Sequence, residues 1–290
     1  MISRRRFVAG AVSLLSLSGR GRADAKSLQI SAETLRRLEE TNGGRLGVAI
    51  IDLAADAPSG YRAEERFPMC STFKFLLAAA VLQRVDRRQE SLERIVAIPA
   101  KPLLGNSPLT EPHAGGAMTT ADLCHAILIR SDNTAANLLL ESIGGPPAIT
   151  AFARSIGDTV TRLDRTETAL NECRPGDARD TTSPAAMAGD LKSVLLGDVL
   201  SAAARDQLTR WMRANITGLE RLRAQLPADW STADKTGSNG EHTSNDIAVM
   251  WPPGRPPIIV AAYITQCPGP EEKRAAMLRE IGQRVRELLP

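Results

Sequence analysis

The sequence has few of the residues that build metal centres and disulfide frameworks. Its 290 residues include three histidines and four cysteines, and none of them is spaced as H-x-H, H-E-x-x-H or C-x-x-C. Zinc enzymes and zinc-stabilised folds depend on ligands that are closely spaced in such motifs. We therefore expect no metal site, and nothing else in the sequence indicates a cofactor.

Long apolar segments are also missing. The N-terminal apolar run, residues 7–17, is shorter than the roughly 20 residues that a membrane-spanning helix needs. It follows the pair Arg4 and Arg5 and precedes the segment "ADA" at 23–25, which is typical of a signal-peptide cleavage site. We predict that residues 1–25 are an export signal peptide of the twin-arginine type, so that the protein is periplasmic or secreted without stable membrane insertion. An ordinary secretory leader and a membrane anchor are the alternatives.

Net charge is small once this leader is set aside. The leader carries five arginines and one aspartate, so its removal changes the formal charge from +3 to −1. The composition therefore predicts no binding to nucleic acid. The rest of the chain is long enough to bury one large core or two coupled ones, and we expect a monomer. A twin-arginine passenger folds in a reducing cytosol, so we expect its fold to need no disulfide.

Strand-like segments lie near both ends of the chain, with helical segments between them. A helix over 31–44, capped by Ser31 and stopped at Gly43 and Gly44, and a strand over 45–54 come first. Strands over 230–237, 245–252 and 257–266 come before a final helix. The last two strands are joined by the turn "PGRP", which favours antiparallel pairing. We predict an α/β (α+β) fold, with an antiparallel sheet flanked by the N- and C-terminal helices and an inserted all-α part.

The same order of elements suggests where the two parts meet. We assign residues 26–66 and 216–290 to the α/β part and residues 67–215 to the all-α part. The spacing of the final helix predicts a buried face made of Ala276, Ile281, Val285 and Leu288. Because ligand sites favour the seam between such parts, we expect the active site there.

One lysine lies within an otherwise apolar stretch, "MCSTFKFLLAAA" at 69–80, which is typical of a buried helix. Ser71 and Lys74 are three residues apart, so they share one helix face. Burial lowers the pKa of a lysine, which allows it to take the proton of a neighbouring serine and activate that serine as a nucleophile. Cys70 is an alternative nucleophile, and a snorkelling side chain is the plainer interpretation of Lys74.

Two further motifs lie downstream of this pair. The tripeptide S-D-N at 131–133 falls between two predicted helices, and K-T-G at 235–237 lies on a predicted strand beside the seam. S-x-x-K, S-D-N and K-T-G in this order are shared by class A β-lactamases and penicillin-binding proteins. Over nearly all of its mature length the chain resembles a class A serine β-lactamase.

The irregular segment 162–184, "RLDRTETALNECRPGDARDTTSP", is similar to the Ω-loop of that family. The resemblance implies that Glu167 activates the water that releases the acyl-enzyme, and that Asn171 helps to hold this water. It also implies that Arg165 and Asp180 form an ion pair between the two ends of the loop. The alternative interpretation of Glu167 is a solvated loop carboxylate.

The resemblance also implies the remaining roles. Ser71 would attack the β-lactam carbonyl, with Lys74 or a water held by Glu167 as the base, while the amides of Ser71 and Ser238 form the oxyanion hole. Ser131 would pass a proton to the departing nitrogen. The expected catalytic residues are Ser71, Lys74, Ser131, Glu167 and Asn171. The expected substrate-binding residues are Asn133, Lys235, Thr236, Gly237, Ser238 and Arg221.

A few positions depart from the family pattern. Arg221 is expected to supply the carboxylate-binding charge that many members carry at the position of Ser244. Asn239 stands where carbapenem-hydrolysing members often have the cysteine that pairs with Cys70, so this disulfide cannot form. Thr168 replaces the proline that often follows the loop glutamate, and the sequence leaves open whether that peptide bond is cis.

The predicted function is hydrolysis of the β-lactam ring of penicillin- and cephalosporin-type antibiotics through a serine acyl-enzyme, which confers resistance to them. A D-Ala-D-Ala carboxypeptidase or transpeptidase and a penicillin-binding sensor that stays acylated share the three motifs. The peptidase needs neither Glu167 nor Asn171, so their presence favours the β-lactam hydrolase.

Overall fold

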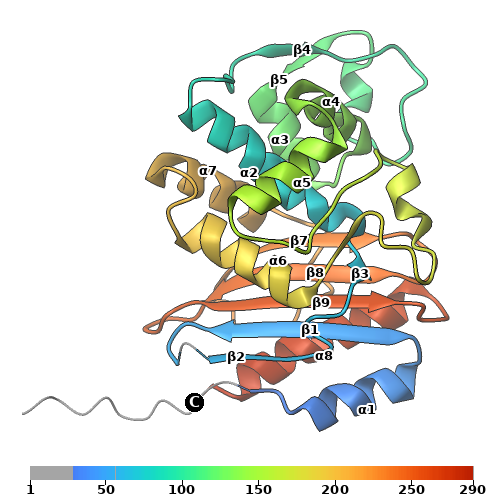
Figure 1. Ribbon diagram of the computed structural model, residues 1–290, viewed down its shortest axis with the longest axis vertical. Coiled ribbons are helices and arrows are strands. Elements are labelled where there is room, and N and C mark those ends of the chain that lie inside the picture. Colours follow the sequence, from blue (N-terminus) through green and yellow to red (C-terminus); the bar gives the residue numbers. More distant parts are fainter. Residues whose placement is uncertain (1–28, 56, 290) are drawn as a thin grey trace, which may run out of the picture.

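A five-stranded antiparallel sheet lies at the centre of the computed structural model, which describes residues 29–55 and 57–289 (Figure 1). The strand order is β2-β1-β9-β8-β7. The strands are β1 (Arg45–Asp52), β2 (Ala57–Tyr61), β7 (Ser231–Ser238), β8 (Ser244–Trp251) and β9 (Ile258–Thr265). The predicted antiparallel sheet is thus confirmed, and it takes its strands from both predicted segments of the α/β part.

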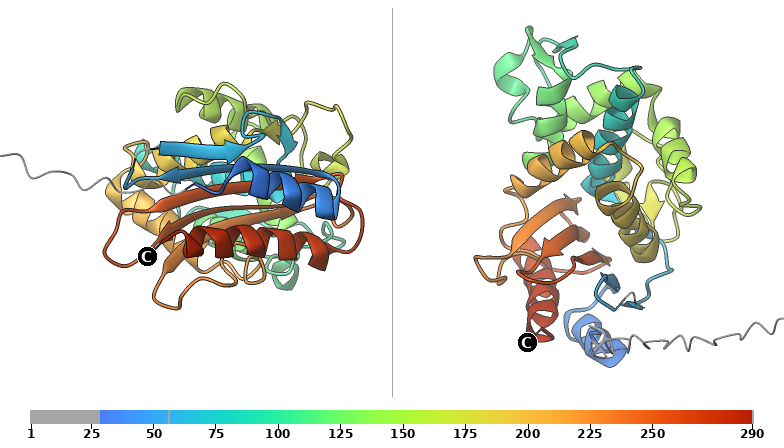
Figure 2. Two further views of the ribbon diagram at one scale, coloured as in Figure 1. Left: turned by 90° about the horizontal axis from the view of Figure 1, so that it is seen from below. Right: turned by 90° about the vertical axis from the view of Figure 1, so that its left-hand side faces the viewer.

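Two terminal helices cover one face of this sheet, α1 (Ala32–Asn42) and α8 (Glu271–Glu287) (Figure 2). Ser31 caps α1 by accepting a hydrogen bond from the Thr34 amide at 3.1 Å, as serine often does at this position. Gly43 ends the helix with a φ of 73°, a conformation that glycine adopts without strain. The capped helix predicted before the first strand is confirmed.

The buried face of α8 differs in part from the prediction. Its buried residues are Arg274, Met277, Leu278, Ile281, Gly282 and Val285. Ala276 is only half-buried, and Leu288 is 46% exposed, so their assignment to the core face was wrong. The helix ends at Glu287. Leu288 lies just beyond it, so the helical spacing does not set the direction of its side chain.

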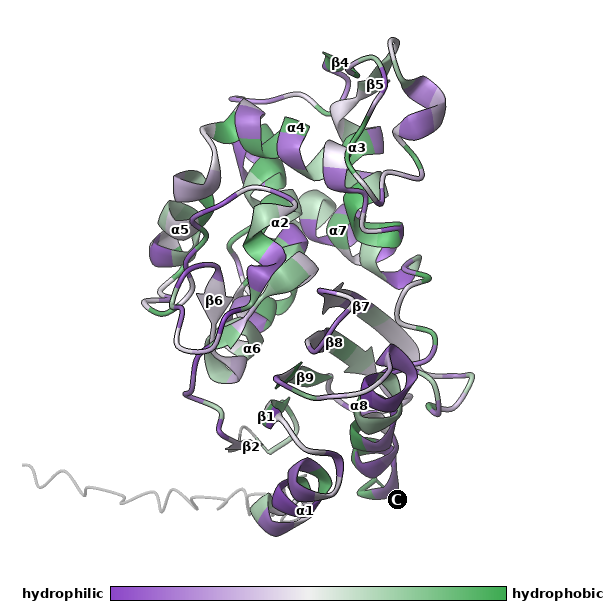
Figure 3. Ribbon diagram, turned by 90° about the vertical axis from the view of Figure 1, so that its right-hand side faces the viewer, coloured by the Kyte–Doolittle hydropathy of each residue, from purple (hydrophilic) through white to green (hydrophobic). Residues whose placement is uncertain are grey.

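Helices cover the opposite face of the sheet around one central helix, α2 (Phe73–Asp86). Its residues 73–82 are all buried, as expected of a helix that is apolar on every side. Around it lie α3 (Thr120–Ile129), α4 (Asn133–Ile143), α5 (Pro146–Ser155), α6 (Pro184–Leu191) and α7 (Ala202–Arg213). Figure 3 shows the apolar character of α2 and α3 against the largely hydrophilic α1 and α8. Among the described residues, no helix is both long enough and apolar enough to cross a membrane.

Short elements that the sequence pattern did not reveal complete the fold. Two small antiparallel ladders pair β3 (Phe67–Pro68) with β6 (Thr181–Thr182) and β4 (Ile95–Ala97) with β5 (Ala117–Thr119). Strands of two or three residues are too short to show a period. Single helical turns are η1 (Cys70–Thr72), η2 (Glu111–His113), η3 (Ala169–Glu172) and η4 (Lys192–Leu196).

Two sequence predictions stay predictions. The signal peptide at residues 1–25 lies outside the described residues. The division into an α/β part and an all-α part, with boundaries at 66/67 and 215/216, also stays a prediction. The sheet strands and the helices around α2 nevertheless meet along β7 and η1, which is where the candidate site lies.

Candidate active site

Ser71 lies in the turn η1, one turn before Lys74 in α2. The Lys74 Nζ atom is 3.0 Å from the Ser71 Oγ atom, and the lysine side chain is completely buried. The shared helix face predicted from the spacing therefore brings the two functional groups into hydrogen-bond contact. Cys70 does not contact this lysine in the same way, since its thiol faces the Ω-loop.

Polar partners surround the ammonium group of Lys74. Its Nζ donates to the Ser131 carbonyl at 2.8 Å and to Asn133 Oδ1 at 2.6 Å. It also forms an ion pair with Glu167 Oε1 at 2.9 Å. Burial lowers the pKa of Lys74, and the Glu167 carboxylate opposes this shift. Ser71 Oγ lies 3.3 Å from Glu167 Oε1, so both Lys74 and Glu167 are within reach of the serine proton.

The aspartate of the S-D-N motif holds the surrounding main chain in place. Asp132 caps α4, because its Oδ1 accepts a hydrogen bond from the Ala135 amide at 2.9 Å. Its Oδ2 accepts from the amides of Leu109 and Thr110, both at 2.9 Å. The aspartate thus fixes the loop beside α4 and orients the serine and asparagine that flank it. Asn133 is fixed in addition by a bond from its Nδ2 to the Gly105 carbonyl at 2.8 Å.

The lysine of the K-T-G motif approaches the same serine from the sheet. Lys235 Nζ donates to Ser131 Oγ at 3.2 Å and to the Thr236 carbonyl at 2.7 Å. The side chain is completely buried. Burial and the nearby cation of Lys74 lower the pKa of Lys235 well below its ordinary value. The Ser131 hydroxyl therefore lies between two lysines, 3.4 Å from the Nζ of Lys74.

Gly237 allows β7 to approach the turn that carries Ser71. A Cβ atom at this position would lie 2.6 Å from the Met69 carbonyl oxygen and 3.1 Å from the Ser71 amide nitrogen. Real side chains do not tolerate the first distance, so any residue larger than glycine would push the strand away. The glycine therefore keeps the Ser71 amide and the neighbouring Ser238 at one end of the cleft.

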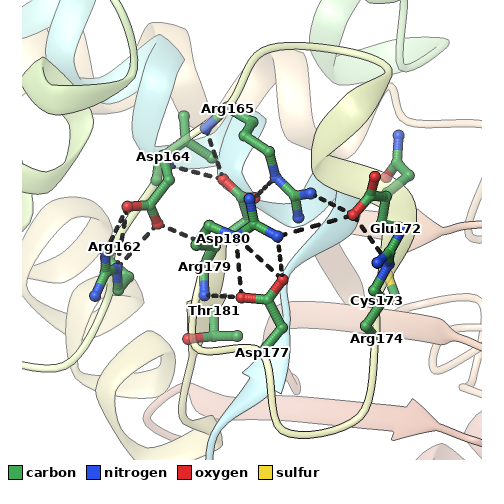
Figure 4. Close-up of polar contacts among 12 residues, drawn as sticks. Arg162, Asp164, Arg165, Glu172, Cys173, Arg174, Asp177, Arg179, Asp180 and Thr181 are labelled. Carbon is green, nitrogen blue, oxygen red and sulfur yellow. Dashed lines mark hydrogen bonds and ion pairs between the residues drawn. The ribbon is translucent and has the colours of Figure 1, made fainter.

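The Ω-loop is closed at its base by Asp180 (Figure 4). Arg165 Nε lies 2.6 Å from Asp180 Oδ2, which forms the ion pair expected between the two ends of the loop. The amides of Asp164 and Arg165 both donate to Asp180 Oδ1, at 2.7 and 2.9 Å. A second ion pair joins Arg165 Nη1 to Glu172 at 2.8 Å. Arg165 and Asp180 therefore fix the loop at its base, outside the cleft.

Two asparagines hold Glu167 in place. Asn171 Nδ2 donates to Glu167 Oε2 at 2.7 Å, while the Asn171 Oδ1 atom is buried with no hydrogen-bond partner among the described residues. Asn137 clamps the main chain, since its Oδ1 accepts from the Glu167 amide at 2.9 Å and its Nδ2 donates to the Glu167 carbonyl at 2.8 Å. The peptide bond between Glu167 and Thr168 is cis. Sequence reasoning missed Asn137, although it follows Asn133 by four residues and so lies on the same face of α4.

Arg221 lies in the wall of the cleft, but its charge is partly neutralised. Its Nη1 donates to the carbonyls of Gly237 and Asn245, at 3.1 and 2.7 Å. Its Nη2 forms an ion pair with Glu271 Oε1 at 2.7 Å. Glu271 begins α8, and no local pattern in the sequence connects it with a residue 50 positions away. Sequence reasoning therefore missed this carboxylate.

A cleft of about 480 Å³ lies between β7 and the helices, and the candidate residues from every motif meet there. Its lining includes Ser71, Ser131, Asn133, Asn171, Thr217, Arg221, Thr236, Gly237, Ser238 and Glu271. An activated serine, a lysine in contact with it and a carboxylate beside both are the groups that acyl transfer to water requires. The fold and the cleft together define a serine hydrolase that works through an acyl-enzyme.

Comparisons with known proteins identify the family. The sequence profile of the beta-lactamase enzyme family matches residues 30–289. The chain is 47% identical to beta-lactamase L2 of Stenotrophomonas maltophilia over 98% of both chains. It is 48% identical to beta-lactamase CTX-M-8 of Citrobacter amalonaticus over 90% of this chain and 88% of that protein. The chain therefore belongs to the beta-lactamase enzyme family, in which it is a class A serine β-lactamase.

Solved structures agree with this assignment. The structure of an ancestral class A beta-lactamase is 58% identical, with a TM-score of 0.86 over 88% of this chain and 98% of that one. A beta-lactamase from Xanthomonas campestris is 50% identical, with a TM-score of 0.87 over 89% of this chain and 98% of that one. The resemblance drawn from the three motifs and the Ω-loop is confirmed.

Proposed function

We propose that Ser71 is the nucleophile with which this class A enzyme opens the β-lactam ring. The enzyme hydrolyses β-lactam antibiotics through a serine acyl-enzyme and thereby confers resistance to them. The observation that carries the proposal is the position of Glu167, whose carboxylate is 3.3 Å from Ser71 Oγ and hydrogen-bonded to Asn171. A carboxylate in this position provides a base for hydrolysing the acyl-enzyme, a step that a penicillin-binding sensor, which stays acylated, does not carry out.

In acylation, Ser71 Oγ attacks the ring carbonyl and gives up its proton. Lys74, whose pKa is lowered by burial, and Glu167 both lie close enough to receive the proton. The amides of Ser71 and Ser238 stabilise the oxyanion that forms. The close approach of β7 at Gly237 supports this role, because it brings the two amides to the same end of the cleft.

Breaking the ring C–N bond requires a proton on the departing nitrogen. The Ser131 hydroxyl supplies it, and Lys74, 3.4 Å away, replaces it. The cation of Lys235, 3.2 Å from the same oxygen, favours the transfer by stabilising negative charge on Ser131. Where Lys74 is the acylation base, the Ser71 proton reaches the nitrogen through Lys74 and then Ser131.

In deacylation, Glu167 takes a proton from water while the water oxygen attacks the ester carbonyl of the acyl-enzyme. The unpartnered Oδ1 atom of Asn171 supports this step, because it is a buried acceptor beside the Glu167 carboxylate. A water bound between these two side chains would satisfy the asparagine and face the ester.

The substrate carboxylate binds to Lys235, Thr236 and Ser238, with Arg221 as an additional positive charge at the end of the cleft. Asn133 binds the side-chain amide of the substrate. Thr217 adds its hydroxyl group to those of Thr236 and Ser238, since its Oγ1 is 2.5 Å from Thr236 Oγ1. We also propose a monomer, with no nucleic-acid partner.

Substitution of Glu167 tests the mechanism. Wild-type protein mixed with a chromogenic cephalosporin should turn over continuously, whereas Glu167→Gln should show a single burst and an intact-mass adduct on Ser71. Ser71→Ala serves as the control, with neither burst nor adduct. Equal turnover by Glu167→Gln would disprove the role of the glutamate, and a wild type that stays acylated would identify a sensor. An unchanged burst rate in Glu167→Gln assigns the acylation base to Lys74, and a slowed burst assigns it to Glu167.

We further propose that residues 1–25 export the protein to the periplasm or the medium by the twin-arginine route. The paired arginines and the "ADA" segment in the sequence support this proposal. A reporter fused to these residues should be exported, and replacing Arg4 and Arg5 by lysine should abolish its export. Export that continues after this change would exclude the twin-arginine route.

A further inference from the structure

Two of the four cysteines lie in contact although they are 103 positions apart along the chain. The Sγ atoms of Cys70 and Cys173 are 3.4 Å from each other, and both residues are buried. Cys124 and Cys267, which also lie in the described part of the chain, show no such sulfur contact. Cys70 therefore contacts a cysteine of the Ω-loop. Position 239, where some family members have the cysteine that pairs with Cys70, is an asparagine in this chain.

We propose that Cys70 and Cys173 form an oxidation site, at which a disulfide bond joins the nucleophile turn to the Ω-loop. The oxidant is an external disulfide, such as glutathione disulfide or the oxidised dithiol of a thiol oxidoreductase. A separation of 3.4 Å places the two thiols in van der Waals contact, so that only a small further approach is needed to reach bonding distance. This inference is independent of the proposed β-lactam chemistry.

A small oxidant can reach the pair through Cys173. This residue lines a second cavity of about 320 Å³, which shares no lining residue with the substrate cleft. Its walls come from the Ω-loop and from the segment around Arg66, and Cys173 follows the ion-paired Glu172 in Figure 4. Oxidation can therefore proceed without an obstacle from bound substrate.

The environments of the two thiols also suggest the order of reaction. The hydrogen bond from Cys70, which outweighs the effect of burial, lowers the pKa of Cys173. The same contact with Cys173, together with burial, raises the pKa of Cys70 well above its ordinary value. Cys173 is therefore the thiol that reacts first, because thiolate is the attacking species.

The reaction balances as a double exchange. The Cys173 thiolate attacks one sulfur of the external disulfide and releases the first external thiol. Cys70 then loses its proton, and its sulfur attacks Cys173 Sγ and releases the second external thiol. The protein loses two hydrogens in total, and the external disulfide gains two electrons and two protons.

The new bond would act on the part of the loop that carries the deacylation residues. Cys173 is two residues beyond Asn171, and Cys70 directly precedes Ser71, so the bond links the two sides of the site. The unfolded chain would also retain a closed loop of more than a hundred residues, which lowers its entropy. We expect the midpoint of thermal unfolding to rise by about 10 °C on oxidation.

The experiment uses the full chain after expression and purification. The protein is reduced, freed of reductant and exposed to glutathione disulfide at pH 8 under native conditions. It is then unfolded in denaturant, so that all four buried cysteines become accessible, alkylated and weighed intact. We expect two of the four thiols to escape alkylation and a peptide map that links residue 70 to residue 173. Cys173→Ser should lose both the link and the shift in thermal unfolding, and Cys124→Ser, as the matched control, should keep both.

Several results would overturn the proposal. They are four alkylated thiols after oxidation, a glutathione adduct that persists on Cys173 with Cys70 still free, and a link that involves Cys124 or Cys267. The mass measurement requires no substrate, so its outcome is separate from that of the test of Glu167. Turnover of a cephalosporin by Cys173→Ser shows that this variant is folded.

Discussion

Asn137 offers a direct test of how the structure holds Glu167, the proposed deacylation base. Its side-chain amide forms two hydrogen bonds to the main chain of Glu167, at 2.9 Å from the amide nitrogen and 2.8 Å to the carbonyl oxygen. The second bond is made to the carbonyl of the cis peptide group between Glu167 and Thr168. The change Asn137→Ala removes both bonds and leaves the Ser71 and Lys74 side chains in place.

The size of the effect follows from the two lost hydrogen bonds. At about 1 kcal/mol for each, Asn137→Ala should lower the free energy of unfolding by about 2 kcal/mol. If the loosened loop loses the same free energy in the transition state of deacylation, the deacylation rate should fall about 30-fold. Where Lys74 is the acylation base, acylation should change little, since the Ser71 to Lys74 contact does not involve Asn137.

Denaturation in urea and stopped-flow mass spectrometry with a cephalosporin measure the two effects. The variant should accumulate acyl-enzyme on Ser71, whereas the wild type should not. Asn137→Asp, which keeps an acceptor for the Glu167 amide but cannot donate to the carbonyl, should lie between them. Asn42→Ala is the matched control, because it removes one hydrogen bond, to Leu38 in α1, on the far side of the sheet. Wild-type deacylation by Asn137→Ala would refute the proposed clamp.

Two further predictions concern charge. Glu271→Gln should lower KM for a substrate carboxylate about threefold at low salt, with kcat unchanged, because it removes the competing partner of Arg221; a raised KM in initial-rate assays would contradict this. Burial and the nearby Asp158 raise the pKa of Asp190 well above its ordinary value, so the folded state retains a proton that the unfolded chain loses above about pH 4. Between about pH 4 and the pKa of Asp190 in the folded protein, this group should therefore lower the free energy of unfolding by about 1.4 kcal/mol per pH unit. Asp190→Asn should remove this contribution. Urea denaturation at several pH values measures the free energy of unfolding of both proteins. Parallel pH profiles for the variant and the wild type would exclude the contribution of Asp190.

The sequence by itself determined the elements whose signals are local. The caps at Ser31 and Gly43, the apolar run of α2 and the turn between β8 and β9 all specify structure through neighbours a few residues away. The catalytic candidates could be named for the same reason, since each motif is a short fixed spacing. The expectation that Ser71 and Lys74 share a face needed only the period of a helix.

Only the tertiary structure decided which distant residues complete the site. Asn137 reaches the Ω-loop 30 positions away, Glu271 reaches Arg221 across 50 positions, and Cys173 reaches Cys70 across 103. The buried face of α8 likewise depends on where the helix ends against the sheet, which is why Leu288 is exposed although its spacing suggested otherwise. Helical and strand periods follow from the geometry of a few residues, whereas these contacts depend on how whole layers pack.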